Sequence, residues 1–344
     1  MRIAVDAMGG DFAPRATVAG AVASATHEGV EILLVGDRAR LERELGRWGR
    51  PDGRLEIVHA EEVIGMDEPA TAVRRKRRSS LVVCAELVRD GHAGAMVTAG
   101  HTGAAMVAAK LALGAIPGVD RPALAAVFPN RRGRTVVLDV GANVDCRPRH
   151  LRQFAVMGHF YAQEVIGMPR PRVGLLSIGE EDQKGNETTR DAAKALAAAG
   201  LNFVGNVEGH DVFNGECDVV VCDGFVGNVL LKGAEAMADL IVGMMREELF
   251  RTSRTRVGGW LAKPAFVNFQ RRTDYAEFGA VPLLGVQGGC FIGHGRSNAK
   301  AIRSAVRSAR EFCEAELHVK IRDRVAVLHE QEERMALAAT EAAT

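Results

Sequence analysis

The chain has 344 residues, of which 47% are hydrophobic and 25% are charged, and its formal net charge is +1. This is the ordinary balance of a soluble globular protein with one large domain or two small ones. Because the net charge is close to zero, any affinity for nucleic acid or an acidic partner must come from local patches. The six cysteines are scattered without a C-x-x-C pair, which argues against a disulfide framework or a zinc ribbon and suits a reducing cytosol.

The sequence predicts neither a signal peptide nor a membrane-spanning helix. The N-terminus reaches Asp6 too early for the apolar region of a signal peptide. The most apolar long segment, residues 93–119, is interrupted by His101, Lys110 and several glycines, so it is too broken to span a bilayer.

Short apolar strands and helices alternate from the start of the chain. We predict strands at residues 3–6, 31–35 and 55–59, with a helix at about 14–27 after the first of them. This alternation predicts parallel strands joined by right-handed crossovers. The densest positive run follows the third strand and contains Arg74, Arg75, Lys76, Arg77 and Arg78. It is either a solvated helix face or an electrostatic landing site for an acidic partner, and it lacks the interleaved aromatic residues of a nucleic-acid site.

A glycine-bearing turn follows the strand expected at residues 95–98. Its residues Gly100, His101, Thr102 and Gly103 open an alanine-rich helix that we expect to reach about residue 113. Such a turn presents free backbone N–H groups and a hydroxyl, which is the chemistry of an anion site. The turn has neither the Walker lysine nor the G-x-G-x-x-G pattern, so nucleotide binding is not indicated.

Two strand-and-loop units within residues 172–228 carry the side chains that we expect to perform the chemistry. Lys184 lies in the loop after the strand at 173–178, and Asn228 in the loop after the strand at 218–222. In open α/β sheets the ligand lies outside the carboxyl ends of the strands. The two side chains should therefore lie on neighbouring rims of one crevice.

Two polar residues at other expected strand ends have two interpretations each. Asp139, near the end of a strand at residues 135–140 that pairs with one at 122–128, either caps the next loop or orients a ligand. Residues 283–292 restore the strand pattern, and the loop after them holds His294, which either faces the crevice or is a buried structural histidine. Ser297 in the same loop is the expected cap of the last long helix.

The segment at residues 251–272 follows a long helix expected at 226–250 and alternates apolar bulk with cations. It is either an amphipathic element on anionic lipid or a dimer contact or flap over the core.

Together these patterns predict a Rossmann-like three-layer α/β/α sandwich with a mostly parallel sheet and a protruding helical segment. We place a single domain at residues 1–312 and a charged helical tail at residues 313–344.

Taken in order, the loop motifs strongly resemble those of the bacterial phosphate acyltransferases, which make acyl phosphate from acyl-[acyl-carrier-protein] for phospholipid synthesis. The matching motifs lie at residues 6–11, 65–68, 99–104, 120–124, 138–145, 179–187, 202–209, 223–228 and 293–295. Each motif is weak alone, whereas the ordered set is specific. The chain departs from the family at His101, where asparagine is usual, and after about residue 314, where nothing matches.

The resemblance implies acyl transfer from a carrier thioester to orthophosphate, with phosphate as the nucleophile and no acylated serine or cysteine. Lys184 would compensate the charge of phosphate or of the tetrahedral oxyanion, and Asn228 would donate a hydrogen bond to it. His294 would give a proton to the departing thiolate. No cofactor and no metal are expected. The full set of expected phosphate- or substrate-binding residues is Gly100, His101, Thr102, Gly103, Asn143, Asn186, Asp223, Gly227, His294 and Gly295.

The resemblance also implies a cytoplasmic homodimer that is peripherally associated with the inner face of the cell membrane and supplies a membrane glycerol-3-phosphate acyltransferase. The acyl chain would lie along the helix after Gly103 or along residues 257–269. The expected membrane contacts are Trp260, Leu261 and Phe266. The acidic carrier protein would dock either on Arg74, Arg75, Lys76 and Arg77 or on Arg271 and Arg272.

Three other interpretations compete with the carrier-dependent acyltransferase. A phosphotransacetylase-like enzyme would use acyl-CoA with the same anion-binding loops. A dehydrogenase would need a dinucleotide fingerprint that the sequence lacks. A catalytically silent protein would recruit a lipid-synthesis enzyme to the membrane. Turnover with acyl-CoA, compared with turnover with the carrier thioester, separates the first of these from the carrier-dependent acyltransferase.

Overall fold

A computed structural model describes residues 1–49, 51, 53–273, 279–327 and 330, and its strands form one mixed sheet in the order β3-β2-β1-β4-β11-β10-β5-β6-β9-β7-β8. The first half-sheet is parallel and contains β1 (Arg2–Asp6), β2 (Glu31–Gly36), β3 (Leu55–His59), β4 (Ala95–Thr98) and β11 (Gly289–Gly293). The second half-sheet is also parallel and contains β6 (Arg134–Leu138), β7 (Val173–Leu176), β8 (Phe203–Val207) and β9 (Val219–Val221).

Two strands with antiparallel pairing join the half-sheets. They are β10 (Ala280–Leu284), which pairs with β11 and β5, and β5 (Ala123–Pro129), which pairs with β10 and β6. We expected one strand at residues 283–292, and the structure instead has the β10–β11 hairpin there. Gly285 and Gly288 have φ of +92° and +148°, which turns the chain between the two strands.

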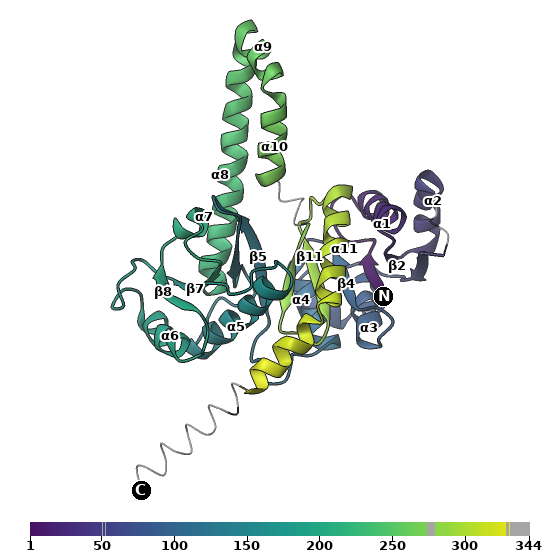
Figure 1. Cartoon of the computed structure of the whole chain (residues 1–344). Helices are drawn as coiled ribbons and strands as arrows, with labels where there is room; N and C mark the ends of the chain where they lie inside the picture. Colours follow the sequence, from purple (N-terminus) through teal and green to yellow (C-terminus); the bar gives the residue numbers. More distant parts are fainter. Residues whose placement is uncertain (50, 52, 274–278, 328–329, 331–344) are drawn as a thin grey trace.

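Alternating strand side chains build two cores, one on each face of the sheet, because successive residues of a strand point to opposite faces. Ile3 and Val5 lie in one core and Ala4 in the other. The first core is covered by α1 (Arg15–His27), α2 (Arg38–Trp48), α5 (Pro148–Glu164), α6 (Glu187–Ala197) and α11 (Ala299–Glu314). The second is covered by α3 (Ser80–Arg89), α4 (Thr102–Ala112) and α7 (Asp211–Asn214). The predicted three-layer sandwich is therefore confirmed (Figure 1).

The packed core continues past residue 312, where we placed the end of the domain. Residues 317–327 form a further helical segment. Its Leu317, Ile321 and Val325 are at most 3% exposed and belong to the first core. These three side chains are spaced four residues apart, so they form one buried stripe on this segment. The segment is part of the domain rather than a detached tail.

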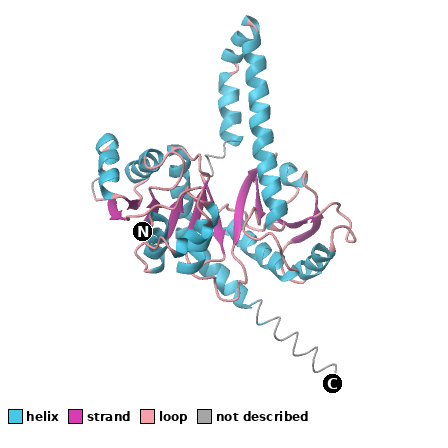
Figure 2. Cartoon of the chain, turned by 180° about the vertical axis from the view of Figure 1, so that it is seen from behind, coloured by secondary structure: helices cyan, strands magenta, loops and turns pink. Residues whose placement is uncertain are grey.

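A helical hairpin projects from the sandwich (Figures 1 and 2). It consists of α8 (Gly224–Arg251), α9 (Ser253–Leu261) at the tip, and α10 (Lys263–Thr273), with the Thr252 hydroxyl capping α9. The projection begins within α8, earlier than residue 251 where we expected it. Among the described residues, no helix combines the length and apolar character needed to cross a bilayer.

Candidate functional site

Three loops of the first half-sheet meet at the carboxyl ends of β1, β4 and β11. The Thr98 hydroxyl donates to the buried Asp6 carboxylate at 2.7 Å and accepts from the Gly100 N–H at 3.0 Å. The Asp11 N–H donates to the carbonyl oxygen of Gly295 at 2.8 Å. The first two bonds tie the start of the turn at residues 100–103 to the end of β1, and the third joins the loop after β1 to the loop after β11.

The close approach of these loops explains why Gly9 is glycine. A Cβ at Gly9 would lie 2.6 Å from Asp6 Oδ2 and 2.9 Å from the Gly100 nitrogen, which no real side chain tolerates. The loop after β1 therefore packs directly on the backbone of the predicted anion turn.

His101 caps the helix that the anion turn opens. Its Nδ1 accepts a hydrogen bond from the Ala104 N–H at 3.1 Å. Asn186 and Asn298 do the same with their side-chain oxygens at the starts of α6 and α11. The imidazole thus performs the capping function that an asparagine side chain performs elsewhere in this chain. Asn298 is also the cap of α11 that we expected of Ser297.

Asp139 organises the loop after β6, and the capping interpretation of this residue is correct. Its carboxylate is fully buried and accepts hydrogen bonds from the N–H groups of Leu124, Ala142 and Asn143 at 2.6–3.0 Å. Burial raises the pKa of this carboxyl, and these hydrogen bonds oppose the rise. The Asn143 amide also donates to Asp139 and to the Pro122 carbonyl, so its side chain holds the loop.

The start of α8 packs against this same loop and presents Asn228. A Cβ at Gly227 would lie 1.9 Å from the Asp139 carbonyl oxygen, so only glycine permits the contact. The Asp223 carboxylate caps α8 by accepting from the Val226 N–H at 2.8 Å. Asn228 is exposed, and its side chain lies 3.7 Å from the position that a Cβ on Gly141 would take.

Lys184 lies on the loop after β7, the strand that pairs with β9 before Asn228. This confirms that the two residues follow neighbouring strands. The backbone N–H of Lys184 donates a hydrogen bond to the Glu181 carbonyl. A Cβ at Gly179 would lie 2.9 Å from Lys184 Cγ, so the methylene chain of the lysine side chain folds back over its own loop. Its ammonium group is exposed and has no hydrogen bond or ion pair with a described residue.

One open cavity of about 1640 Å³ connects the two half-sheets. Thr102 and His294 reach it from the first half, and Val140 and Asn228 from the second. Its long wall is apolar and is built by β5 and by the first half of α8. The other expected substrate-binding residues lie in the surrounding loops and do not line the cavity; they are Gly100, His101, Gly103, Asn143, Asn186, Asp223, Gly227 and Gly295. Lys184 also lies outside the lining.

The sequence did not predict the β5–α8 wall. We expected the acyl chain along α4 or residues 257–269, yet α4 contributes only Thr102 and, among the described side chains of the later segment, only Ala265 and Phe269 line the cavity. The sequence does show an apolar run at residues 123–129 and a mostly apolar start of α8, but it does not show that the two meet.

His294 is exposed, so the interpretation as a buried structural histidine is wrong. Its Nδ1 accepts a hydrogen bond from the Arg296 N–H at 3.1 Å. The tautomer that accepts at Nδ1 carries its proton on Nε2. The ring that lines the cavity therefore has its N–H donor at Nε2.

The basic run lies beside the anion turn. It begins in the short helix η1 (Ala70–Arg74), which packs on α4, and Arg74, Arg75 and Arg77 are exposed. Lys76 is instead engaged by Glu68 and by the Val63 carbonyl. Arg271 and Arg272, the other expected dock, lie in the last turn of α10, and their side chains are outside the described part of the chain.

Comparison with solved structures supports the fold. The chain has a TM-score of 0.65 with a phosphotransacetylase from Streptococcus pyogenes at 18% identity, covering 91% of this chain and 94% of that one. The EutD phosphotransacetylase from Staphylococcus aureus gives a TM-score of 0.60 at 14% identity, covering 90% and 94%. At such identities the likeness establishes the fold alone.

Sequence comparison gives the family. The model of the family described as "Fatty acid synthesis protein" matches residues 1–320. A relative from Pelotomaculum thermopropionicum named "Phosphate acyltransferase" is 55% identical over 94% of this chain and 95% of its own length. One of the same name from Geotalea uraniireducens is 48% identical over 94% of each. This chain therefore belongs to the fatty acid synthesis protein family, together with relatives that are named phosphate acyltransferases.

Proposed function

We propose that this protein transfers an acyl group from the thioester of an acyl carrier protein to orthophosphate, and so forms acyl phosphate for phospholipid synthesis. The single observation that carries the proposal is the cavity. Its lining includes polar groups from both half-sheets, namely Thr102, Asn228 and His294, together with a largely apolar wall. A site of this form suits a substrate with a charged reacting end and a long hydrocarbon.

The state of the cysteines supports phosphate as the direct nucleophile. Burial, together with the neighbouring Asp139 and Asp223, raises the pKa of the Cys146 thiol to about 12. Burial also raises the pKa of Cys222, the other thiol beside these loops, well above its usual value. A thiol in this state is not ionised at neutral pH, so it is a poor nucleophile. Attack by phosphate needs no acylated cysteine.

In the proposed reaction, a phosphate oxygen attacks the thioester carbonyl and a tetrahedral oxyanion forms. The N–H groups at the start of α4 and the Asn228 amide hold the anionic oxygens. Collapse of the intermediate expels the carrier thiolate. His294 relays a proton to its sulfur: Nε2 gives its proton to the thiolate and takes the proton that the attacking phosphate loses on forming acyl phosphate. Lys184 lies outside the cavity lining, so its charge acts on the incoming anion from the neighbouring strand end.

The exposed arginines of the basic run support docking of an acidic carrier. Arg74, Arg75 and Arg77 lie beside the turn whose Thr102 lines the cavity, so a carrier bound there can deliver its thioester. If so, the KM for the carrier substrate rises steeply with salt, because surface attraction is screened. A KM for the carrier substrate that does not change with ionic strength would exclude electrostatic docking of the carrier on these arginines.

The hairpin supports a homodimer and a peripheral membrane contact with the inner face of the cell membrane. Apolar side chains of α8 are exposed along its length, and Trp260 and Leu261 at the tip are 73% and 68% exposed. An apolar stripe on the stem suits a second copy of the hairpin, and apolar residues among cations at the tip suit anionic lipid. The double variant Trp260→Glu, Phe266→Glu should stay dimeric and lose liposome binding. Loss of the dimer instead would assign the tip to the subunit contact.

The deciding experiment supplies purified protein with a long-chain acyl-carrier thioester, with and without orthophosphate. We expect phosphate-dependent release of the carrier thiol and of a product that hydroxylamine traps. Activity with acyl-CoA alone would move the assignment to a phosphotransacetylase-like enzyme. If the protein turns over neither the carrier thioester nor acyl-CoA, the better interpretation is a protein that recruits a lipid-synthesis enzyme to the membrane.

A further inference from the structure

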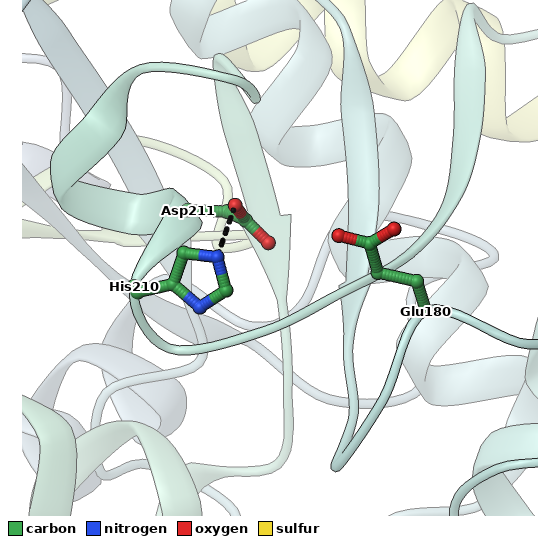
Figure 3. A group of neighbouring side chains, drawn as sticks. All are labelled: Glu180, His210 and Asp211. Atoms are coloured by element: carbon green, nitrogen blue, oxygen red, sulfur yellow. Dashed lines mark ion pairs between the residues drawn. The ribbon is translucent and has the colours of Figure 1, made fainter.

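Three potential metal ligands meet outside the cavity lining, where two loops of the second half-sheet face each other. Glu180 comes from the loop after β7, and His210 and Asp211 come from the start of α7 after β8. Their ligand atoms all lie within 4.8 Å of one another. Figure 3 shows the Glu180 carboxylate directed across the gap toward the imidazole and the Asp211 carboxylate. We propose that these three residues bind one divalent metal ion of the zinc class.

The two ligands from α7 already have a suitable separation. His210 Nε2 lies 3.2 Å from Asp211 Oδ1. Zinc ligands at tetrahedral angles lie about 3.4 Å apart, given metal–ligand distances of about 2.0–2.2 Å. Asp211 Oδ2 accepts a hydrogen bond from the Glu208 N–H at 2.8 Å, which orients the carboxylate. Oδ1 faces His210 Nε2, and the two atoms would exchange this contact for bonds to the ion. Asp211 is 5% exposed, so its position is fixed by packing.

The backbone holds the third ligand opposite the first two. The Ser177 N–H donates to the Val207 carbonyl at 2.8 Å, and the Asn206 amide donates to the Glu181 carbonyl at 3.0 Å. These bonds lie on either side of Glu180 and join its loop to β8. Glu180 itself is exposed, so a change of side-chain rotamer brings its carboxylate to the ion.

The donor set determines the class of ion. One imidazole nitrogen and two carboxylates suit zinc and similar transition metals, whereas magnesium and calcium prefer oxygen ligands alone. Three protein ligands leave positions for water or an anion. The ion would also join α7 to the loop that carries Lys184, four residues after Glu180, and so restrain that loop.

The test uses the full chain, stripped of metal by chelation and titrated with zinc by calorimetry in excess magnesium. We expect one equivalent of zinc per chain for the wild type and for His92→Ala, a matched control that removes an exposed histidine elsewhere. His210→Ala and Glu180→Gln, both at exposed positions, should weaken binding at least tenfold. Zinc should also raise the Tm of the wild type and of the control, because an ion that binds only the folded state stabilises it.

The proposal is overturned if the wild-type chain takes up no zinc, or if either His210→Ala or Glu180→Gln binds zinc as the wild type does. Tetrahedral or five-coordinate Co²⁺ absorption in the wild type, lost in His210→Ala, gives an independent spectroscopic check. None of these measurements depends on acyl transfer, so failure of the metal site and failure of the proposed function are distinguishable.

Discussion

The Thr98 hydroxyl links the buried Asp6 carboxylate to the backbone of the anion turn, because it donates to Asp6 Oδ2 and accepts from the Gly100 N–H. Burial raises the pKa of Asp6, and hydrogen bonds from Ser80 and Thr98 oppose that rise. One hydroxyl therefore both compensates a buried acid and positions the N–H groups that follow it.

Thr98→Val tests this link. The substitution keeps the side-chain shape, removes the hydroxyl and takes one donor away from the buried Asp6 carboxylate. We expect the free energy of unfolding to fall by about 1–3 kcal/mol, measured by urea denaturation, and the KM for phosphate to rise. Thr98→Ser keeps the hydroxyl and should restore both quantities. A Thr98→Val protein with wild-type stability and KM would show that the link is dispensable.

His101 gives a prediction about capping. Since its ring does what asparagine does at the starts of α6 and α11, His101→Asn should preserve stability and turnover. His101→Ala removes the acceptor for the Ala104 N–H and should cost about 0.5–2 kcal/mol of unfolding free energy. If His101→Asn proved as damaging as His101→Ala, the imidazole would have a function beyond the cap.

Gly227 and Gly243 form a matched pair within α8. A Cβ on Gly227 meets the Asp139 carbonyl at 1.9 Å, whereas one on Gly243, which does not line the cavity, meets nothing within 4 Å. Gly227→Ala should displace the first turn of α8 and with it Asn228, so turnover should fall sharply. Gly243→Ala should leave turnover unchanged and raise stability by up to about 1 kcal/mol. The comparison is made from thermal melts and initial rates of both variants.

Arg172 and Asp218 give the clearest pH dependence. Burial alone would raise the pKa of Asp218, but hydrogen bonds from the guanidinium and backbone N–H of Arg172 outweigh it and hold this pKa below its usual value of 3.8. A depressed carboxyl pKa contributes stability that is present above the unfolded-state pKa and is lost as pH falls through the folded-state pKa.

Asp218→Asn should therefore lower the urea midpoint at pH 7, and its difference from the wild type should shrink as the pH falls below about 4. The measurement is a series of urea melts from pH 7 to pH 3. A difference that stays constant over this range would mean that the pair contributes packing rather than charge.

The apolar wall gives a prediction about acyl-chain length. Ala234 lines the cavity and Ala236, on the same helix, does not. Ala234→Phe should fill part of the groove and shift the preference in kcat/KM toward shorter acyl chains, while Ala236→Phe should leave the profile unchanged. Rates with a series of acyl-carrier thioesters decide this. Equal profiles for the two variants would place the acyl chain elsewhere.

Much of the sheet was predictable because its strands are short apolar runs that end at glycine-bearing loops. The third strand was predicted to the residue, at Leu55–His59. The β10–β11 hairpin was read as one strand because its turn, residues 285–288, contains apolar Val286 between two glycines and so continues the apolar pattern.

The site was less predictable, for a physical reason. Asn186 and Asp223 stand just before helices, and a polar side chain there can bind a ligand or cap the helix with the same atoms. In the structure both side chains accept from the N–H three residues later. The wall also depends on contact between β5 and α8, which are far apart in sequence, and no local pattern shows that they meet.

The position of β11 has a consequence for synthesis of the chain. β4 is flanked by β1 and β11, and β11 begins only at Gly289. While the ribosome makes the intervening residues, β4 has an unpaired edge that can recruit strands of other nascent chains. The N-terminal half-sheet cannot close until β11 has emerged, so a chain that stalls or is cut before Gly289 should aggregate rather than persist as a folded half.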